Sequence, residues 1–341
     1  MNSFSKNSKI EIINQQIEPV NCGVPFLFGL FVSSANYSEE KNIEVSTDIK
    51  DLHPFIFKNI KNIIKNYQKI QEKYQKNTKN SVFFDNLIKN NHLEEYIFLK
   101  NNFKINERMF YKIVFKYPIL SELFSLFGIE EKLSLLDNIN CFSNNFESLK
   151  AFIKGVYIGC ATSSIKISDK PNEKTSSGYH LEFTSKNIIL LREISHLIAQ
   201  FDISAKLISR KNNYVLYIKD SENVSDLLAL VGANNSVVTL QNEIVKREFR
   251  NKINRQTNCL SGNISKTVEA SLKQLEAIDK IDKEMGLENL PPDLEEIALM
   301  RLANPEEPLN NLLKLSRLNL TNSGVKHRVK RLISIADNFK K

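Results

Sequence analysis

The sequence predicts an α+β protein in which two similar mixed repeats are followed by an all-helical C-terminal region. Three observations support this fold class. A short apolar helical pattern opens each repeat, near residues 26–31 and 151–160. Alternating, strand-like segments and amphipathic helical patterns follow each opening helix. Residues 286–341 then contain helical patterns alone, separated by Pro and Asn breaks.

Composition sets the class of protein. The chain has 341 residues, 42% apolar and 25% charged, so two or three folded parts are expected. Its 10 Gly, 9 Pro and 4 Cys exclude collagen-like chains and disulfide scaffolds. The longest apolar stretch, residues 26–32, is far below the roughly 20 residues of a membrane-spanning helix. With no secretory pattern at the N-terminus, we expect a cytoplasmic protein without a membrane contact.

The cysteines and histidines do not form metal-ligand patterns. No two cysteines have CxxC spacing, and neither His180 nor His196 has a Cys or His neighbour at ligand spacing. We therefore expect no metal, no cofactor and no disulfide. The net charge of +8 favours a partner with phosphates or another anionic surface.

The two repeats follow one plan. In the first, a strand at 42–47 and a helix at 52–74 follow the apolar helix, whereas residues 76–145 indicate helices without a topology. In the second, a strand at 179–184, a helix at 188–201, strands at 205–209 and 214–219 and a helix at 225–231 are expected. Asn212-Asn213 supplies positive φ for the hairpin turn, and Gly232 ends the last helix. Such a duplication gives a pseudo-twofold within one chain, which predicts a monomer.

A basic segment follows the repeats. Its cations, accompanied by the single acid Glu248, are Lys246, Arg247, Arg250, Lys252 and Arg255. They indicate either contacts with a DNA backbone or an interdomain hinge. A polar amphipathic helix at 264–283 comes next, with Asn263 or Ser265 as its N-cap and Gly286 at its end.

The C-terminal region predicts a helix-turn-helix. Helices are expected at 293–303, 308–315 and 323–339, with a polar turn at 316–323 before the last. Leucines give the second helix an apolar face (Leu309, Leu312, Leu313 and Leu315). The third has a complementary one (Val325, Val329, Leu332, Ile333 and Ala336). From residue 314 to the end, the chain contains eight Lys or Arg residues and a single acid, Asp337. This pattern favours double-stranded DNA as partner, although a solvated basic helix end has the same composition.

The third helix supplies the candidate DNA-binding residues. Lys326 and Arg328 come early in it and are expected at base edges, followed by His327. Lys330 and Arg331 are expected at phosphates. The small residues Ser323 and Gly324 would allow close backbone approach and offer free N–H groups to a phosphate.

The two apolar helices resemble a known motif. The nonapeptides 27–35 (LFGLFVSSA) and 153–161 (IKGVYIGCA) share a Gly at the third position, where a small residue lets two helices pack closely. They resemble degenerate copies of the LAGLIDADG motif of homing endonucleases, whose paired helices join two αββαββα halves. In that family the eighth position carries the acid that binds the catalytic metal. Here it is Ser34 and Cys160, so the resemblance implies the scaffold without nuclease activity.

Further segments match another family in order along the chain. They are 152–157 (FIKGVY), 179–182 (YHLE), 217–222 (YIKDSE), 250–255 (RNKINR), 258–259 (NC), 263–268 (NISKTV) and 323–328 (SGVKHR). These resemble the WhiA family of bacterial regulators, which couple a LAGLIDADG-like domain to a helix-turn-helix. The resemblance implies a non-enzymatic, sequence-specific transcription factor tied to cell division, and to sporulation where sporulation occurs. The Lys- and Asn-rich composition indicates a small AT-rich genome, for which a role in cell division is expected rather than one in sporulation.

The expected domains are a LAGLIDADG-like domain at 1–240, with repeats at about 22–130 and 147–235, a basic linker and helix at 241–285, and the helix-turn-helix at 286–341. The implied location is the nucleoid, with DNA and other regulatory proteins as partners. Two alternatives are an active metal-dependent LAGLIDADG endonuclease, and RNA binding through aromatic residues between Phe83 and Phe115. The absence of carboxylates at the motif ends argues against the endonuclease. RNA binding is disfavoured because these aromatic residues are expected to lie in the core.

Overall fold

The chain forms two compact units, Met1–Lys246 and Arg247–Lys341, and each is described by itself. The computed structural model describes residues 3–37, 42–74, 81–90, 92–105, 108–129, 134–165, 178–315 and 321–339. The division falls inside one helix, α11 (Asn234–Met285).

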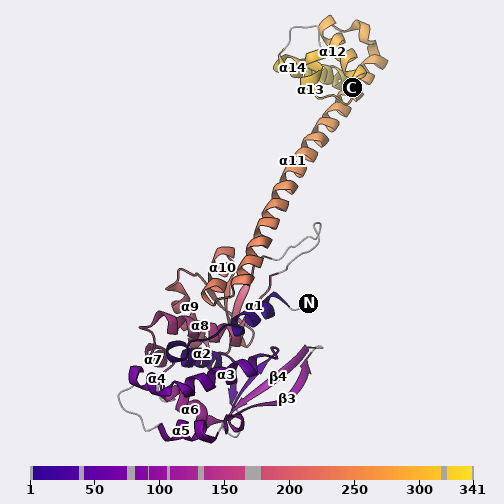
Figure 1. Cartoon of the computed structure of the whole chain (residues 1–341). Coiled ribbons are helices and arrows are strands. Elements are labelled where there is room, and N and C mark those ends of the chain that lie inside the picture. The colour runs from indigo at the N-terminus through magenta and orange to yellow at the C-terminus, as the bar shows by residue number, and fades with distance from the viewer. Residues whose placement is uncertain are drawn as a thin grey trace. The chain divides into compact units, whose positions relative to one another are not determined.

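The first unit contains two αβ halves, as the sequence predicted (Figure 1). The N-terminal half comprises α1 (Phe4–Ile13), a π-helical turn (Pro19–Gly23), α2 (Val24–Ser34), β1 (Ala35–Tyr37), β2 (Ile43–Thr47), α3 (Leu52–Lys65), α4 (Tyr67–Tyr74), α5 (Ser81–Asn90), a 3-10 turn (His92–Glu95), β3 (Ile97–Ile105), β4 (Arg108–Phe115), α6 (Tyr117–Ser125) and α7 (Leu135–Asn140). The second half comprises α8 (Phe146–Cys160), β5 (Ala161–Ser163), β6 (Leu181–Ser185), α9 (Ile188–Ala199), β7 (Lys206–Arg210), β8 (Asn213–Ile218) and α10 (Ser221–Leu230).

The two sheets have the same topology. Their antiparallel strand orders are β1-β2-β4-β3 and β5-β6-β8-β7. Even the register repeats, because Ala35 lies opposite Val45 just as Ala161 lies opposite Phe183. The second half keeps the αββαββα order, and the first adds α4 and α5 between its strand pairs. The predicted duplication is therefore present in the fold.

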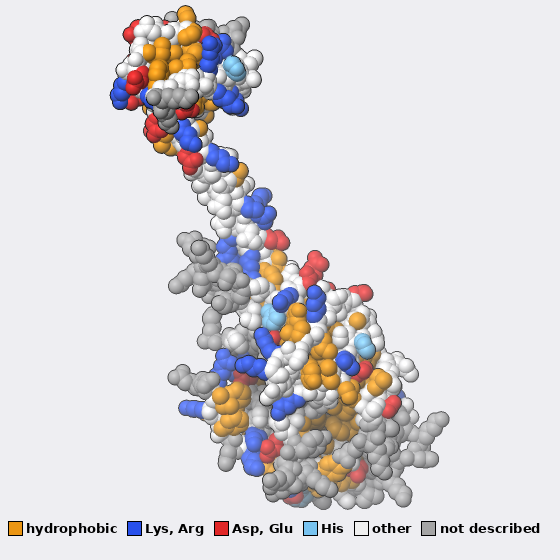
Figure 2. Space-filling model, turned by 180° about the vertical axis from the view of Figure 1, so that it is seen from behind, with side chains coloured by type: hydrophobic (Ala, Val, Ile, Leu, Met, Phe, Trp, Pro, Cys, Tyr) orange, Lys and Arg blue, Asp and Glu red, His pale blue; other side chains and the backbone are white. Residues whose placement is uncertain are grey.

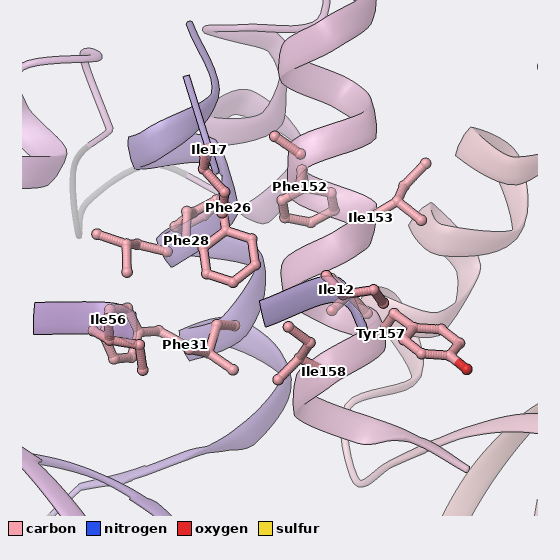
Figure 3. Packing of buried hydrophobic residues seen from close by; sticks show 14 of the residues in the cluster. Ile12, Ile17, Phe26, Phe28, Phe31, Ile56, Phe152, Ile153, Tyr157 and Ile158 are labelled. Carbon is pink, nitrogen blue, oxygen red and sulfur yellow. The ribbon is translucent and has the colours of Figure 1, made fainter. Parts of the chain in front are cut away.

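Helices α2 and α8 lie side by side at the centre of the first unit (Figure 3). A Cβ at Gly29 would overlap the Phe152 carbonyl oxygen, and one at Gly155 would overlap that of Phe26. Only glycine allows this approach of two backbones. Phe26 and Phe152 are fully buried at the contact. The third-position glycines of the two motif copies thus have the packing role that the sequence predicted.

Local predictions in the first unit needed several corrections. The polar N-terminus forms α1, which buries Phe4, Ile12 and Ile13 against the core. Residues 76–145, for which no topology was predicted, contain the hairpin β3–β4 as well as helices. The β7–β8 hairpin is confirmed, but its positive φ is at Lys211 (54°) and not at the Asn pair.

Helix α11 is longer than predicted. It begins at Asn234, where the Glu11 carboxylate of α1 accepts hydrogen bonds from the N–H groups of Asn235 (2.5 Å) and Ser236 (3.1 Å). It continues without interruption through Asn263 and Ser265, one of which was predicted as an N-cap. The basic segment 246–255 is therefore helical and not a linker between helices.

The second unit packs the end of α11 against three helices, α12 (Pro292–Ala303), α13 (Leu309–Leu315) and α14 (Asn322–Asn338). Its core combines residues of α11, α12 and α14 (Ala277, Ile278, Ile281, Leu294, Ile297, Ala298, Val325, Val329, Leu332 and Ala336). Arg301 is buried and donates hydrogen bonds to the carbonyl oxygens of Asn304 (3.2 Å) and Glu307 (2.7 Å), which holds the α12–α13 turn. The helical C-terminal region is confirmed, and its core extends into α11.

Candidate nucleic-acid interface

Helix α14 separates its apolar and cationic residues. Val325, Val329, Leu332 and Ala336 face the core of the second unit, with the spacing of an amphipathic helix. The opposite face exposes cationic side chains and a histidine (Lys326, His327, Lys330 and Arg331). Figure 2 shows Lys, Arg and His side chains gathered at one edge of the second unit. Four predicted site residues are thus brought together on an accessible face.

Arg328 has a different environment from its neighbours. Its Nε–H donates to Asp293 Oδ2 of α12 at 2.9 Å, and its Nη1 donates to the Gly324 carbonyl oxygen at 3.4 Å. The side chain is 25% exposed. The ion pair joins α14 to α12. The guanidinium, which was predicted at a base edge, therefore makes its contacts within the domain.

The N-terminus of α14 is capped by its own chain. Thr321 Oγ1 accepts a hydrogen bond from the Gly324 N–H at 3.2 Å. The expectation of a free N–H at Gly324 is therefore wrong, and Ser323 is exposed. The signal was available in the sequence, since Thr three residues before a helical N–H is a common N-cap.

The helix that precedes α14 in the motif is only partly described. Leu312 of α13 is buried and Leu309 packs against the core of the second unit. The predicted turn at 316–320 lies outside the described residues, as do the side chains of Leu313 and Leu315.

The basic residues of α11 surround the helix rather than forming one face. Lys246 pairs with the buried Glu243 at 2.9 Å. Arg247 and Arg250 are half-buried, whereas Lys252 and Arg255 are exposed. Five cations in one helical stretch raise the local positive potential, which attracts phosphates.

The ends of the two motif helices do not provide metal ligands. Ser34 donates its hydroxyl hydrogen bond to the Leu30 carbonyl oxygen at 2.6 Å. Cys160 is half-buried, and the loss of solvent around it raises the pKa of its thiol to about 12. Among the described residues, no group of three His, Cys, Asp or Glu side chains could hold a metal ion.

An ammonium group lies beside the second motif end. Lys9 of α1 donates to the Ile158 carbonyl oxygen at 2.9 Å, and burial lowers the pKa of its amine. A thiol and an ammonium do not fit Mg²⁺, which binds hard oxygen ligands, and neither motif end carries a carboxylate. Lys9 could not be predicted from the sequence, because only the tertiary fold places α1 against α8.

Comparison with known proteins identifies the family. The sequence model of the WhiA LAGLIDADG-like domain matches residues 149–250, and that of the WhiA C-terminal HTH domain matches residues 253–336. A Clostridium botulinum protein named "Probable cell division protein WhiA" is 34% identical over 255 residues, 72% of this chain and 76% of that protein. The chain belongs to the WhiA family.

Other WhiA proteins agree with this assignment. The WhiA protein of Clostridium acetobutylicum, with the same printed name, is 40% identical over 195 residues, 57% of this chain and 59% of that one. The crystal structure of full-length WhiA from Thermotoga maritima matches 99% of both chains with a TM-score of 0.51 at 22% identity, which supports the fold. Among the described residues, no helix is both long and apolar enough to cross a membrane.

Proposed function

We propose that this WhiA-family chain is a non-enzymatic, sequence-specific DNA-binding transcriptional regulator linked to cell division and associated with the nucleoid. The observation that carries the proposal is the exposed cationic face of α14 within the matched helix-turn-helix domain. A helix with such a face fits the major groove, where cations meet phosphates and guanine edges. The printed names of the relatives support the link to cell division.

The roles of the α14 residues follow from their exposure. Lys326 and His327 lie in the first turns, where a recognition helix contacts base edges. Lys330 and Arg331 lie further along and bind phosphates. Arg328 positions α14 through Asp293 and reaches a base only when that ion pair opens.

The rest of the chain supports the interface. Arg247, Arg250, Lys252 and Arg255 of α11 add sequence-independent phosphate contacts. The DNA-binding domain comprises residues 286–341 together with the last turns of α11 that complete its core. The LAGLIDADG-like domain serves as a scaffold, since its motif ends hold a hydroxyl and a thiol instead of carboxylates. Nuclease activity therefore has no support in the donor groups.

Genomic binding sites and a matched pair of variants test the proposal. Crosslinking of the full chain to its genome supplies the target sequence, and fluorescence anisotropy then measures its Kd. We expect Lys326→Ala to cost about 1–3 kcal/mol on the target and much less on random DNA if it reads a base. Lys211→Ala, in the turn of the β7–β8 hairpin, is the control and should leave the Kd unchanged.

Two results would count against this assignment. Equal loss of affinity for target and random DNA would move Lys326 to a phosphate contact. Unchanged affinity after Lys326→Ala, Lys330→Ala and Arg331→Ala are combined would show that α14 is not the DNA-binding helix.

A further inference from the structure

The middle of α11 is a helix without tertiary packing in the described structure. Every residue from 251 to 266 is exposed, on all sides of the helix. The same stretch is rich in poor helix formers (Asn251, Asn254, Asn258, Ser261, Gly262, Asn263 and Ser265). Helical stability in proteins comes mainly from packing of an apolar face. This stretch therefore requires a partner surface to be a stable helix.

An apolar stripe runs along this stretch within the second unit. Phe249, Ile253, Leu260, Ile264 and Val268 are 64%, 43%, 63%, 63% and 49% exposed. Together with Thr257 they repeat every 11 residues, as 249/260, 253/264 and 257/268. At about 100° per residue, the six positions fall within an arc of roughly 100°. An 11-residue repeat stays close to the period of an ordinary α-helix and marks a continuous packing face.

The spacing of the stripe is the same read in either direction. Steps of 4, 4, 3, 4 and 4 residues are symmetric about the middle of the stripe, between residues 258 and 259. A twofold axis at this point places 249 opposite 268, 253 opposite 264 and 257 opposite 260 of a second helix. Such a self-complementary surface is what an isologous contact between identical chains requires.

Charge favours the antiparallel arrangement over a parallel one. In a parallel pair, Arg250, Lys252 and Arg255 would lie beside the same cations of the partner helix. In the antiparallel pair they lie beside its residues 262–267, whose single charged side chain is Lys266. The two helix dipoles then also oppose each other, which is favourable.

We propose that residues 249–268 of α11 form an antiparallel helix pair with the same residues of a second copy of this chain. The contact is modest in area. Five half-exposed apolar side chains contribute on the order of 500 Å² per chain, below the roughly 800 Å² of a standard interface, so the dimer is reversible in the micromolar range. The pair replaces the monomer expected from the internal duplication, which considered the LAGLIDADG-like half alone.

Sedimentation of the full chain without DNA tests the pairing. We expect the wild type to change from monomer to dimer between about 1 and 100 µM. Leu260→Asp buries a carboxylate twice per dimer and should raise the dimer Kd at least about 100-fold, tenfold for each copy. Asn258→Asp adds the same group on the opposite side of the helix and should leave the Kd within about twofold.

Disulfide trapping tests the orientation. In a Cys259→Ser background, which removes the exposed native thiol, a mixture of Phe249→Cys and Val268→Cys chains should give disulfide-linked heterodimers, whereas Phe249→Cys alone should not crosslink. Crosslinking of Phe249→Cys with itself would overturn the antiparallel pair.

A wild-type chain that stays monomeric up to 200 µM would overturn the proposal. If Leu260→Asp then weakened DNA binding of that monomer, the stripe would be a nucleic-acid contact. Because dimerisation is measured without DNA, and the α14 variants leave residues 249–268 unchanged, failure of this inference is separate from failure of the proposed function.

Discussion

Cationic side chains have opposite environments near the contact between α2 and α8, here called the α2–α8 seam, in the first unit and on the exposed face of α14 in the second. At the end of α8, Lys9 is half-buried near Cys160, and the loss of solvent lowers the pKa of its amine. On α14, Lys326, Lys330 and Arg331 are exposed to solvent. Burial disfavours the charged form of a lysine, whereas exposure leaves it available to a phosphate. The difference shows that one chain contains both a scaffold in which a cation is shielded from solvent and a surface on which cations remain available to a ligand.

The largest expected effect is a loss of stability at the α2–α8 seam. Gly155→Ala should lower the free energy of unfolding by about 3 kcal/mol, because the added Cβ overlaps the Phe26 carbonyl oxygen and forces the helices apart. Gly262→Ala is the matched control, since nothing lies within 4 Å of its added Cβ. It should stabilise the chain by up to about 1 kcal/mol. Urea unfolding measures both, and equal effects would show that α2 and α8 do not touch through their backbones.

Alkaline pH tests whether the motif end is closed. Burial raises the pKa of Cys160 from 9.0 to about 12, so the folded chain keeps a proton that the unfolded chain loses. Stability from this group is complete below pH 9 and is lost as the pH rises toward 12. The free energy of unfolding of wild type relative to Cys160→Ala should therefore fall by up to about 1.4 kcal/mol per pH unit above pH 9.

Lys9 is the internal check on that experiment. Its folded pKa is lowered, so its contribution to stability increases as the pH rises toward 10.5. Lys9→Met should remove this rise. The free energy of unfolding of wild type relative to Lys9→Met should therefore increase with pH, opposite in sign to the effect of Cys160. A flat difference for both variants between pH 8 and 11 would mean that water reaches the end of α8.

The smallest effect concerns the attachment of α14. Arg328→Ala and Asp293→Ala should each lower the stability of the second unit. Their double variant should lose less than the sum, with a coupling of about 0.5–1 kcal/mol for a partly exposed ion pair. Additive losses in thermal unfolding would show that the pair does not hold α14, and would return Arg328 to the candidates for base contact.

Local patterns in the sequence predicted the position of α14 and which of its side chains face the core. The periodicity of Val325, Val329 and Leu332 was enough to place α14 and its cationic face, because side chains at i, i+4 and i+7 share one side of any helix. The third-position glycines, Gly29 and Gly155, likewise indicated the seam, since close helix contact requires small residues.

Other features were decided by the tertiary structure alone. The β3–β4 hairpin escaped prediction because an irregularity between Lys100 and Phe103 interrupts the alternation of a regular strand. Helix α11 runs through Asn263, which in isolation favours a cap.

The contacts of Lys9 with α8 and of Arg328 with Asp293 join segments far apart in the chain. Periodicity along the sequence reports which side of an element is apolar, and it carries no information on which distant residue that element meets. That is why the face of α14 was predictable from the sequence, while the availability of each cation on it, and the position of Lys9 beside the end of α8, depended on the fold.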